Sequence, residues 1–499
     1  PDWIAENLPK GGKLGFDRWL FTQDGVARFR KGAEAAGGEL IAVTDNPLDA
    51  VWQDQPDQPM ALVVPHDIAF AGESSTDKRG RLAAALRKAK RDATVITAPD
   101  SIAWLLNIRG GDVPHSPLPL SLAILYGDGQ VDLFLDTEKR GRGLTKHLGN
   151  EVSLQAPEAF APALDALKDK VVQADPGLTA AWVFERLTAA GAEIAGATDP
   201  CQLPKAIKNE VELQGARAAH TRDGAALVRF QHWLSVFAPQ GELDELAVEA
   251  QLEEFRHDGE HFRDLSFPTI TGSGPNGAIV HYRVTADSNR KLGTGEFYLV
   301  DSGGQYLDGT TDVTRTIAIG AVSDEMRDRF TRVLKGHIAI ATTRFPTGTT
   351  GAQLDVLARH ALWQAGLDFD HGTGHGVGSY LNVHEGPHSI SKRQQTQDLR
   401  PGMVVSNEPG YYKTGAYGIR IENLLAVRQA EVPGGERDML EFETLTLSPI
   451  DRNAIMPELL SEAETTWLNT YHQRVYDALS PNVDDPTREW LDEATRPIG

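Results

Sequence analysis

The sequence predicts a multidomain protein that combines α/β and α+β architecture, and three observations lead to this prediction. The chain has 499 residues, enough for about three domains of roughly 150 residues each. Short apolar strands alternate with helical stretches up to about residue 204, as in βα layers. From about residue 205 onward, longer helices accompany β-hairpin patterns, which is typical of an antiparallel sheet backed by helices.

The composition excludes several classes of protein. Hydrophobic residues make up 40% of the chain and charged residues 24%, which argues against global disorder, collagen-like repeats and a disulfide scaffold. The net charge of −21 disfavours nucleic acid or an anionic membrane as partner. Cys201 is the single cysteine, so neither an intrachain disulfide nor a thiolate metal site is possible. We therefore expect a cytoplasmic protein with no nucleic-acid or membrane partner.

The first part, residues 1–74, is predicted to belong to a small α/β domain. Residues 24–36 have a helical pattern, and the apolar runs 40–43 and 61–64 have the character of strands. The chain opens on Pro1 rather than on methionine, so we expect the true N-terminus of the protein to lie upstream of it.

The second part, residues 75–206, repeats the α/β pattern. It contains a predicted helix over residues 79–92, a strand over 94–97, and a strand pair within 122–135 that turns at the Gly-Asp-Gly of 127–129. A second small α/β domain follows from this alternation.

The third part, residues 207–499, contains the residues that suggest chemistry. Helices are predicted over 210–237 and 244–257, and another follows Ser323 behind an acidic first turn. Two β-rich segments, 296–317 and 404–425, each contain a glycine-rich turn. We expect each of them to form a hairpin.

Each predicted hairpin holds two carboxylates. Asp301 and Asp312 lie 11 positions apart in the first, and Glu408 and Glu422 lie 14 apart in the second. Acidic residues are depleted in strands, so this placement indicates that something cationic faces them. Arg420 lies two residues before Glu422, which predicts the same strand face.

Between the hairpins lies the segment His371-Gly-Thr-Gly-His375-Gly-Val-Gly, followed by Asn-Val-His384. The interleaved glycines favour a loop or strand over a helix, and no P-loop Lys-Ser/Thr follows them. Four buried carboxylates and one imidazole would repel strongly unless two divalent cations compensated their charge. Such a pair of ions generates a hydroxide and polarises a carbonyl or phosphoryl oxygen. Oxygen-rich ligation favours Mn²⁺ or a similar hard ion, with Zn²⁺ and Co²⁺ as the alternatives.

These segments resemble the pita-bread metallopeptidases, and within them the large three-domain Xaa-Pro aminopeptidases. The resemblance is carried by DSGGQYLDGTTDVTRT, HGTGHGVGSYLNVHEGP and NEPGYYKTGAYGIRIEN, together with LSFPTI and GPNGAIVHY upstream. It runs from about residue 75 to the end. It implies a pita-bread catalytic domain, of the creatinase/aminopeptidase type, over residues 207–499. Two creatinase-N-like α/β domains would precede it, the first truncated, and the family likeness also implies a homodimer.

The resemblance implies a role for each matching residue. Two divalent metal ions would be held by Asp301, Asp312, His375, Glu408 and Glu422. Asp312 and Glu422 would bridge both ions, and Asp301 would bind one of them in bidentate fashion. Glu408 would also transfer protons. The residues that would surround the substrate are His281, His384, His371 and Arg420. His281 and His384 are also catalytic candidates, and Arg420 would fix the orientation of Asp301.

The implied function is a metal-dependent aminopeptidase that releases the N-terminal residue from short peptides with proline in second position, through a hydroxide bridging two metals. A prolidase, restricted to Xaa-Pro dipeptides, is the first alternative, because the same fold and metals serve both. The second, of another class, is a non-catalytic pita-bread protein that binds partners. The presence of all five ligand-type residues disfavours this second alternative and also metal-free, creatinase-like hydrolysis.

Overall fold

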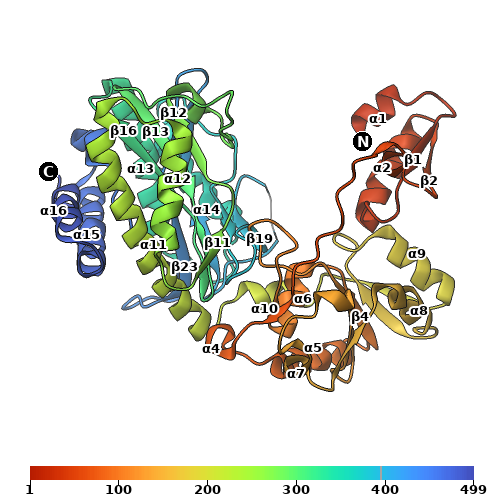
Figure 1. The fold of residues 1–499 in the computed structure, drawn as a ribbon. Helices are drawn as coiled ribbons and strands as arrows, with labels where there is room; N and C mark the ends of the chain where they lie inside the picture. The colour runs from red at the N-terminus through yellow and green to blue at the C-terminus, as the bar shows by residue number, and fades with distance from the viewer. Residues whose placement is uncertain (394–395) are drawn as a thin grey trace. The chain divides into compact units, whose positions relative to one another are not determined.

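The computed structural model describes residues 1–393 and 396–499 and divides the chain into two compact units. The first unit comprises Pro1–Lys205 and the second Ala206–Gly499 (Figure 1). The predicted boundary between a first and a second domain, at residues 74/75, lies inside the first unit. The predicted division into three domains therefore stays a prediction.

The first unit is built around a mixed six-stranded sheet in the order β10-β9-β4-β6-β7-β8. Its strands are β4 (Ala93–Ile96), β6 (Leu122–Tyr126), β7 (Val131–Phe134), β8 (Val152–Gln155), β9 (Val171–Ala174) and β10 (Glu193–Gly196). Smaller pairs are formed by β1 (Lys13–Phe16) with β2 (Glu39–Ala42), and by β3 (Val64–Pro65) with β5 (Ile108–Arg109).

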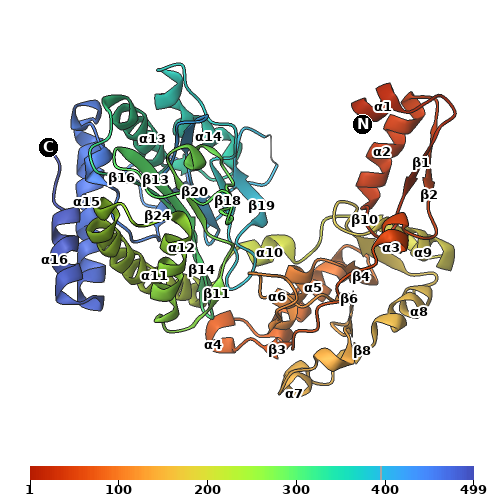
Figure 2. The ribbon, with the colours of Figure 1, turned by 45° about the horizontal axis from the view of Figure 1, so that its top comes forward.

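Helices alternate with these strands along the chain, as predicted. They are α1 (Asp2–Asn7), α2 (Gln23–Ala35), α3 (Pro47–Val51), α4 (Ile68–Ala71), α5 (Ser75–Lys88), α6 (Pro99–Leu106), α7 (Leu144–Leu148), α8 (Phe160–Asp165), α9 (Ala181–Ala190) and, at the junction of the units, α10 (Gln202–Ala206). Helices α1 and α2 pack side by side (Figure 2). Buried apolar side chains from β4, β6, β9, α8 and α9 form one core cluster.

Two expectations for this unit were wrong in detail. The helix expected over 79–92 occupies Ser75–Lys88, because the Ser74 side chain caps it by accepting from the Asp77 N–H, and the chain turns at Lys90, whose φ is 57°. The strand expected over 61–64 is reduced to the two residues of β3, where Val64 pairs with Arg109. Apolar character alone did not distinguish that strand from an extended, Pro-flanked connection.

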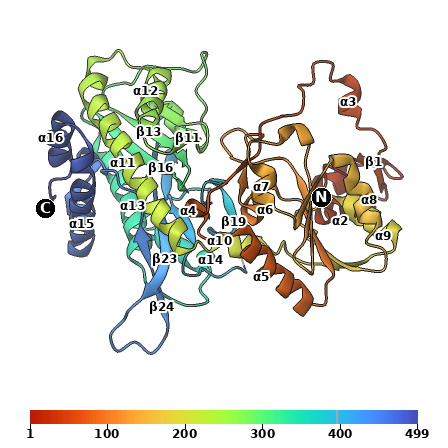
Figure 3. The same ribbon diagram turned by 60° about the horizontal axis from the view of Figure 1, so that its bottom comes forward.

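The second unit contains two antiparallel sheets that position the candidate site. The first is three-stranded, with β12 (Ile270–Ser273), β13 (Glu296–Ser302) and β16 (Val313–Ile319). The second has the order β17-β24-β23-β20-β18-β19. Its strands are β17 (Phe345–Pro346), β18 (Gly374–Gly376), β19 (Glu385–Ile390), β20 (Val404–Asn407), β23 (Asn423–Ala430) and β24 (Met439–Thr444). The β23–β24 hairpin extends well beyond the rest of the sheet (Figure 3).

Two short ladders complete the strands of this unit. One contains β11 (Phe262–Leu265), β14 (Gly304–Tyr306) and β15 (Gly309–Thr310), and the other is the hairpin of β21 (Gly410–Lys413) and β22 (Tyr417–Arg420).

Long helices cover these sheets. They are α11 (Glu210–Phe237), α12 (Glu245–His257), α13 (Asp324–Thr342), α14 (Gly351–Trp363), α15 (Glu462–Leu479) and α16 (Asp485–Ala494). Side chains of α11 and α12 form one buried cluster with β13 and β16, and the two helices lie next to each other in Figure 1. The expected antiparallel sheet backed by helices is therefore observed. Among the described residues, no helix combines the length and apolar character needed to cross a membrane.

Helix boundaries in this unit follow from capping residues. Helix α11 begins with a capping box, in which Asn209 and Glu212 satisfy each other's backbone N–H groups. Helix α13 begins where the Ser323 side chain accepts from the Met326 N–H. It crosses α14 closely, because Gly336 has no Cβ to meet the Ala358 carbonyl oxygen, which would lie 2.0 Å away.

Candidate metal centre

The first pair of carboxylates comes from the antiparallel pair of β13 and β16. Asp301 lies in β13, opposite Thr314 of β16, and Asp312 immediately precedes β16. Gly303 lets the turn fold tightly, because a Cβ there would lie 1.9 Å from the Thr311 carbonyl oxygen. Both aspartates are buried.

The second pair of carboxylates lies at two breaks between strands rather than within one hairpin. Strand β20 pairs with β23 as far as Asn407 and Asn423, whereas β21 and β22 form a separate hairpin. Glu408 follows β20 and Glu422 precedes β23. Pro409 has no N–H to continue the ladder, so the chain leaves the large sheet at this point. The predicted single hairpin over 404–425 is thus wrong.

Backbone hydrogen bonds join the two pairs. The Glu422 N–H donates to the Thr314 carbonyl at 3.1 Å, and the Arg315 guanidinium donates to the Glu422 carbonyl at 2.6 Å. The Thr314 hydroxyl also donates to Glu422 Oε2 at 2.8 Å. β16 therefore fixes both the backbone and the carboxylate of Glu422, which brings the two distant segments of the sequence to one site.

The imidazole of His375 comes from β18, a strand flanked by glycines. A Cβ at Gly374 would lie 1.9 Å from the Ser406 carbonyl oxygen, and one at Gly376 would lie 2.1 Å from the Glu385 carbonyl oxygen. These glycines therefore let β18 pack closely between its neighbours, which explains their spacing without any phosphate-binding role. His375 Nδ1 donates to the Gly376 carbonyl at 3.0 Å. This hydrogen bond leaves Nε2 with its lone pair free for a ligand.

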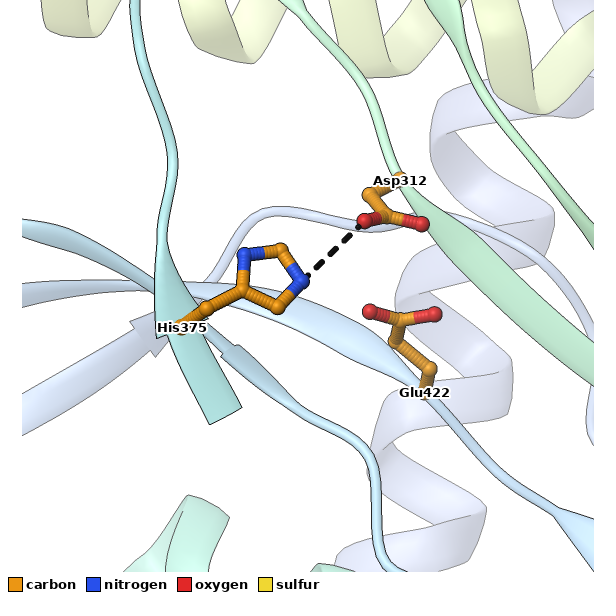
Figure 4. A group of neighbouring side chains, drawn as sticks. All are labelled: Asp312, His375 and Glu422. Carbon is orange, nitrogen blue, oxygen red and sulfur yellow. Dashed lines mark ion pairs between the residues drawn. The ribbon is translucent and has the colours of Figure 1, made fainter. Parts of the chain in front are cut away.

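These elements bring three candidate ligands together. Atoms of Asp312, His375 and Glu422 lie within 4.8 Å of one another, and Figure 4 shows the three side chains directed toward a common point. His375 Nε2 lies 3.4 Å from Asp312 Oδ2 and 3.6 Å from Glu408 Oε1. Asp301 and Glu408 line the same pocket, whose volume is about 350 Å³.

The electrostatics of this pocket fit divalent cations. Burial raises the pKa of Asp312 well above its ordinary value, and the nearby Asp301 and Glu408 add to the effect. The pKa of Glu422 is raised in the same way, by burial and then by Asp312. Among the described residues, Asp301 Oδ1 and Glu422 Oε1 are buried without a hydrogen-bond partner. Carboxylate oxygens left in this state have the chemistry of metal ligands.

Arg420 is the cation nearest to the carboxylates. Its Nη2 donates to Asp301 Oδ2 at 2.7 Å, its Nε to the Thr314 hydroxyl at 3.1 Å, and its Nη1 to the Tyr412 hydroxyl at 2.6 Å. The side chain is 2% exposed. One guanidinium compensates one carboxylate of four, so the cluster keeps an excess of negative charge.

The three other predicted histidines line the same pocket in different ways. His371 is half-buried, and its Nε2 lies 2.9 Å from the Tyr412 hydroxyl. Burial and then Arg420 lower the pKa of His371 to about 3. His281 and His384 are exposed, and the His384 ring lies 4.2 Å from the His375 ring, nearly perpendicular to it.

Sequence reasoning missed several residues of this site. Thr314, Ser406 and Tyr412 orient candidate ligands or Arg420. The signal that could have found them is their position in the sequence, two to four residues from a predicted ligand. The pocket wall also contains Phe267, Ile270, Val280 and Arg283. Two of these, Phe267 and Ile270, lie in the LSFPTI segment, which the sequence analysis singled out without assigning it a place.

Comparisons with known proteins agree with this arrangement. Residues 214–429 match the model of metallopeptidase family M24, residues 54–212 match a creatinase/prolidase N-terminal domain, and residues 438–498 match the C-terminal region of peptidase M24. A probable Xaa-Pro aminopeptidase P from Paracoccidioides brasiliensis is 41% identical over 518 residues, which cover all of this chain and 84% of the relative.

The chain belongs to metallopeptidase family M24.

Solved structures extend the comparison. The crystal structure of an X-prolyl aminopeptidase from Caenorhabditis elegans, described as a cytosolic enzyme with a di-nuclear active site, superimposes with a TM-score of 0.95 at 36% identity and covers 100% of this chain and 83% of that one. An Xaa-Pro dipeptidase from Bacillus anthracis matches with a TM-score of 0.62 at 25% identity, over 76% of this chain and 99% of that one. The M24 resemblance, expected from about residue 75 onward, thus extends over the whole chain.

Family membership also fixes the coarse domain order. A creatinase/prolidase N-terminal domain precedes the M24 pita-bread catalytic domain, and a C-terminal region follows it. In the M24 domain the candidate ligands lie on both antiparallel sheets, Asp301 and Asp312 at β13–β16 and the others at β18, β20 and β23.

Proposed function

We infer that this chain is a metal-dependent Xaa-Pro aminopeptidase, which releases the N-terminal residue from peptides with proline in the second position. One observation carries the inference: four carboxylates and the His375 imidazole meet in a single pocket in a chain that is similar over its full length to an X-prolyl aminopeptidase with a di-nuclear active site. A catalytically silent M24 binding protein would have no need for this excess of buried negative charge.

Two divalent cations are the cofactors we propose. Asp301 would hold one ion, His375 and Glu408 the other, and Asp312 and Glu422 would contribute to both. Four carboxylates balance the charge of two divalent ions, and oxygen-rich ligation favours Mn²⁺ over Zn²⁺ or Co²⁺. When bound, such ions lower the pKa of water and polarise a carbonyl oxygen.

Glu408 is the residue we propose for proton transfer. It is half-buried beside His375, and the Ser406 hydroxyl donates to its Oε1 at 3.3 Å. Withdrawal from water inside the pocket raises the pKa of Glu408, which makes its carboxylate a stronger base. It would accept the proton of the attacking water and transfer it to the proline nitrogen as the peptide bond breaks.

The substrate contacts we propose involve exposed groups of the pocket. The bond before proline is a tertiary amide with no N–H, so recognition must depend on its carbonyl and on the proline ring. His281 and His384 are exposed in the pocket and would hold the carbonyl and flank the ring. His371, which is bonded to the Tyr412 hydroxyl, would contribute to the wall behind them.

Arg420 was predicted near the substrate, and we propose that it acts through Asp301. Its guanidinium is buried and its three donor nitrogens contact Asp301, Thr314 and Tyr412. This arrangement fixes the orientation of a ligand carboxylate, a function typical of groups behind a metal site.

The remaining proposals concern organisation. We propose two creatinase-N-like α/β domains, one over 1–74 and a second over 75–206, before a catalytic domain over 207–499. The separate β1–β2 sheet and the six-stranded sheet of the first unit support that division. A homodimer in the cytoplasm is the assembly we propose, with short Xaa-Pro peptides as substrates.

The test is a peptide panel on metal-reconstituted protein. We expect hydrolysis of Xaa-Pro-Yaa tripeptides after loading with Mn²⁺, and no hydrolysis of matched Xaa-Ala-Yaa controls. Cleavage of Xaa-Pro dipeptides alone would instead establish a prolidase, the activity described for the Bacillus anthracis relative. Absence of bound and activating metal would support the non-catalytic binding protein.

A further inference from the structure

Glu245 forms a hydrogen-bonding hub away from the metal centre. It lies in the first turn of α12, and its side chain is fully buried. Its Oε1 accepts from the Ser273 N–H at 2.7 Å and from Asn276 Nδ2 at 3.0 Å, and its Oε2 from the Tyr282 hydroxyl at 3.1 Å and the Arg290 N–H at 3.3 Å. Two of these donors are backbone N–H groups, which can only donate. They therefore favour the ionised form of the Glu245 side chain, which can only accept.

All of these donors belong to the segment 273–290, which contains His281. The network is internally connected, because Asn276 Nδ2 lies 2.8 Å from the Tyr282 hydroxyl, and that hydroxyl also lies 3.0 Å from the Ser288 carbonyl oxygen. This segment has little regular structure beyond the short 3₁₀ turn Gly274–Ala278. Hydrogen bonds to the Glu245 side chain therefore hold this segment in place, whereas strand pairing holds the segments that carry the carboxylate ligands.

The residues on both sides of His281 are fixed although His281 itself is exposed. Val280 accepts from Arg420 Nη1 at 3.4 Å. Tyr282 is 5% exposed, and its ring packs with Ile270 and Leu299 in a buried cluster. Between these two anchors the His281 side chain lines the pocket. Its backbone is thus held from one side by Arg420 and from the other by Glu245.

We propose that Glu245 is a positioning residue that acts through Asn276 and Tyr282 to hold His281 in the substrate pocket. The proposal rests on the proposed function, because it assigns His281 to substrate contact. Its physical basis is that an exposed side chain on an irregular segment keeps its reactive geometry only if its backbone is fixed, and small displacements of such groups have large effects on rate.

The first test measures the segment itself and needs no activity. Hydrogen exchange is followed in the metal-loaded wild type, in Tyr282→Phe and in Tyr298→Phe. Tyr298 is an equally buried tyrosine of β13 whose hydroxyl makes none of these hydrogen bonds to Glu245. We expect amides of residues 276–283 to exchange about tenfold faster in Tyr282→Phe, as on loss of one buried hydrogen bond, and to be unchanged in Tyr298→Phe. Unchanged exchange in Tyr282→Phe would overturn the proposal.

The second test is a double-mutant cycle with His281→Ala on an Xaa-Pro-Yaa substrate. We expect Tyr282→Phe to lower kcat/KM about tenfold in the wild type, mainly through kcat, and to have almost no effect in the His281→Ala background. Metal content should stay at the wild-type value in both single variants, and Tyr282→Phe should lower the midpoint of thermal unfolding only by the stability of that one hydrogen bond. An equal loss in both backgrounds would mean that Tyr282 acts independently of His281, which contradicts the proposal.

A third variant tests the hub. Glu245→Gln keeps the size of the side chain but removes the charge and half of the acceptor capacity. We expect it to reproduce the exchange and kcat effects of Tyr282→Phe and to be non-additive with it. Failure of the wild type to cleave any Xaa-Pro peptide would refute the proposed function, whereas the exchange measurement would still decide whether Glu245 holds the segment.

Discussion

The carboxylates and the exposed histidines of the same pocket are held in opposite ways. Asp301 and Asp312 lie in or next to β-strands, are buried, and contact Arg420 or other carboxylates. His281 and His384 are exposed and lie outside the strands, and each is followed in the chain by a buried residue that fixes its backbone. Tyr282 bonds to Glu245 in one case, and Glu385 forms a buried ion pair with Lys208 at 2.6 Å in the other.

The difference follows from charge. Ligand carboxylates repel one another, so only a ladder-bound backbone and bound cations keep them together. A neutral imidazole carries no such penalty and needs only a defined backbone position, which leaves its side chain free to meet a substrate. Removing a carboxylate should therefore affect metal and activity together, and removing an exposed histidine should affect activity alone.

The largest effect is expected from Asp312→Ala or Glu422→Ala. Each removes a carboxylate that we propose contributes to both metal ions, so we expect kcat to fall by about 10³ or more and the metal content of the purified protein to fall with it. Metal analysis and tripeptide hydrolysis measure the two effects. Full metal content in an inactive Glu422→Ala variant would show that this carboxylate is not a ligand.

His384→Ala should lower kcat by about 100- to 1,000-fold, the range expected for loss of one positioned hydrogen-bond donor. Metal content should remain that of the wild type. His257→Ala, at an exposed histidine of α12, is the matched control and should leave turnover unchanged. Loss of metal from the His384 variant would instead place this residue with the ligands, and the comparison above would fail.

Arg420→Lys tests the link between the carboxylates and the surrounding structure. A lysine keeps the charge but cannot reach Asp301, Thr314 and Tyr412 together, so we expect metal affinity to fall about tenfold. A metal titration followed by activity gives the value. Arg428→Lys, at an exposed arginine paired with Glu441, serves as control, and an identical loss there would point to a general destabilisation.

A stability measurement isolates the charge repulsion. In chelator-treated protein, Glu422→Gln removes one negative charge from the cluster, whereas the amide oxygen can still accept from the Thr314 hydroxyl. We expect the free energy of unfolding of this variant to exceed that of the chelated wild type by about 1–2 kcal/mol. Its unfolding temperature should rise accordingly. With metal present the order should reverse. A lower unfolding temperature for the chelated variant would show that Glu422 is already neutral or well solvated.

The smallest effect concerns a histidine outside the pocket. His472 Nε2 accepts from the Ile450 N–H at 3.1 Å, and burial, then Arg315, lowers its pKa to about 3. Its contribution to stability is complete above pH 6.5 and is lost as the pH falls toward 3, because only the unfolded chain then takes up the proton. At pH 5.5 the loss is about 1.3 kcal/mol relative to pH 7.

His472→Gln keeps an acceptor that does not titrate. The free energy of unfolding is measured at pH 7 and at pH 5.5 for both proteins. Between these pH values it should fall in the wild type by more than in the variant, and the difference should equal the loss calculated for His472. Identical pH slopes in the two proteins would show that His472 is protonated in the folded state.

Much of the local structure could be predicted from short-range patterns. The boundaries of α11 were predicted at Glu210–Phe237, because its capping box and apolar spacing are both local signals. The division of residues 404–425 between two sheets was not predicted. Its cause, the pairing of Asn407 with Asn423 across the whole intervening hairpin, depends on contacts between residues far apart in the sequence.

The sequence by itself determined which side chains are available for chemistry: four acidic residues in β-rich segments, histidines between glycines, and motifs that belong to family M24. Only the tertiary structure decided that Asp312, His375 and Glu422 meet within 4.8 Å, that Arg420 also contacts Tyr412, and that Glu245 holds the segment around His281. The physical reason is that residue type and spacing specify periodicity and charge, whereas convergence of separate strands depends on packing of the whole second unit.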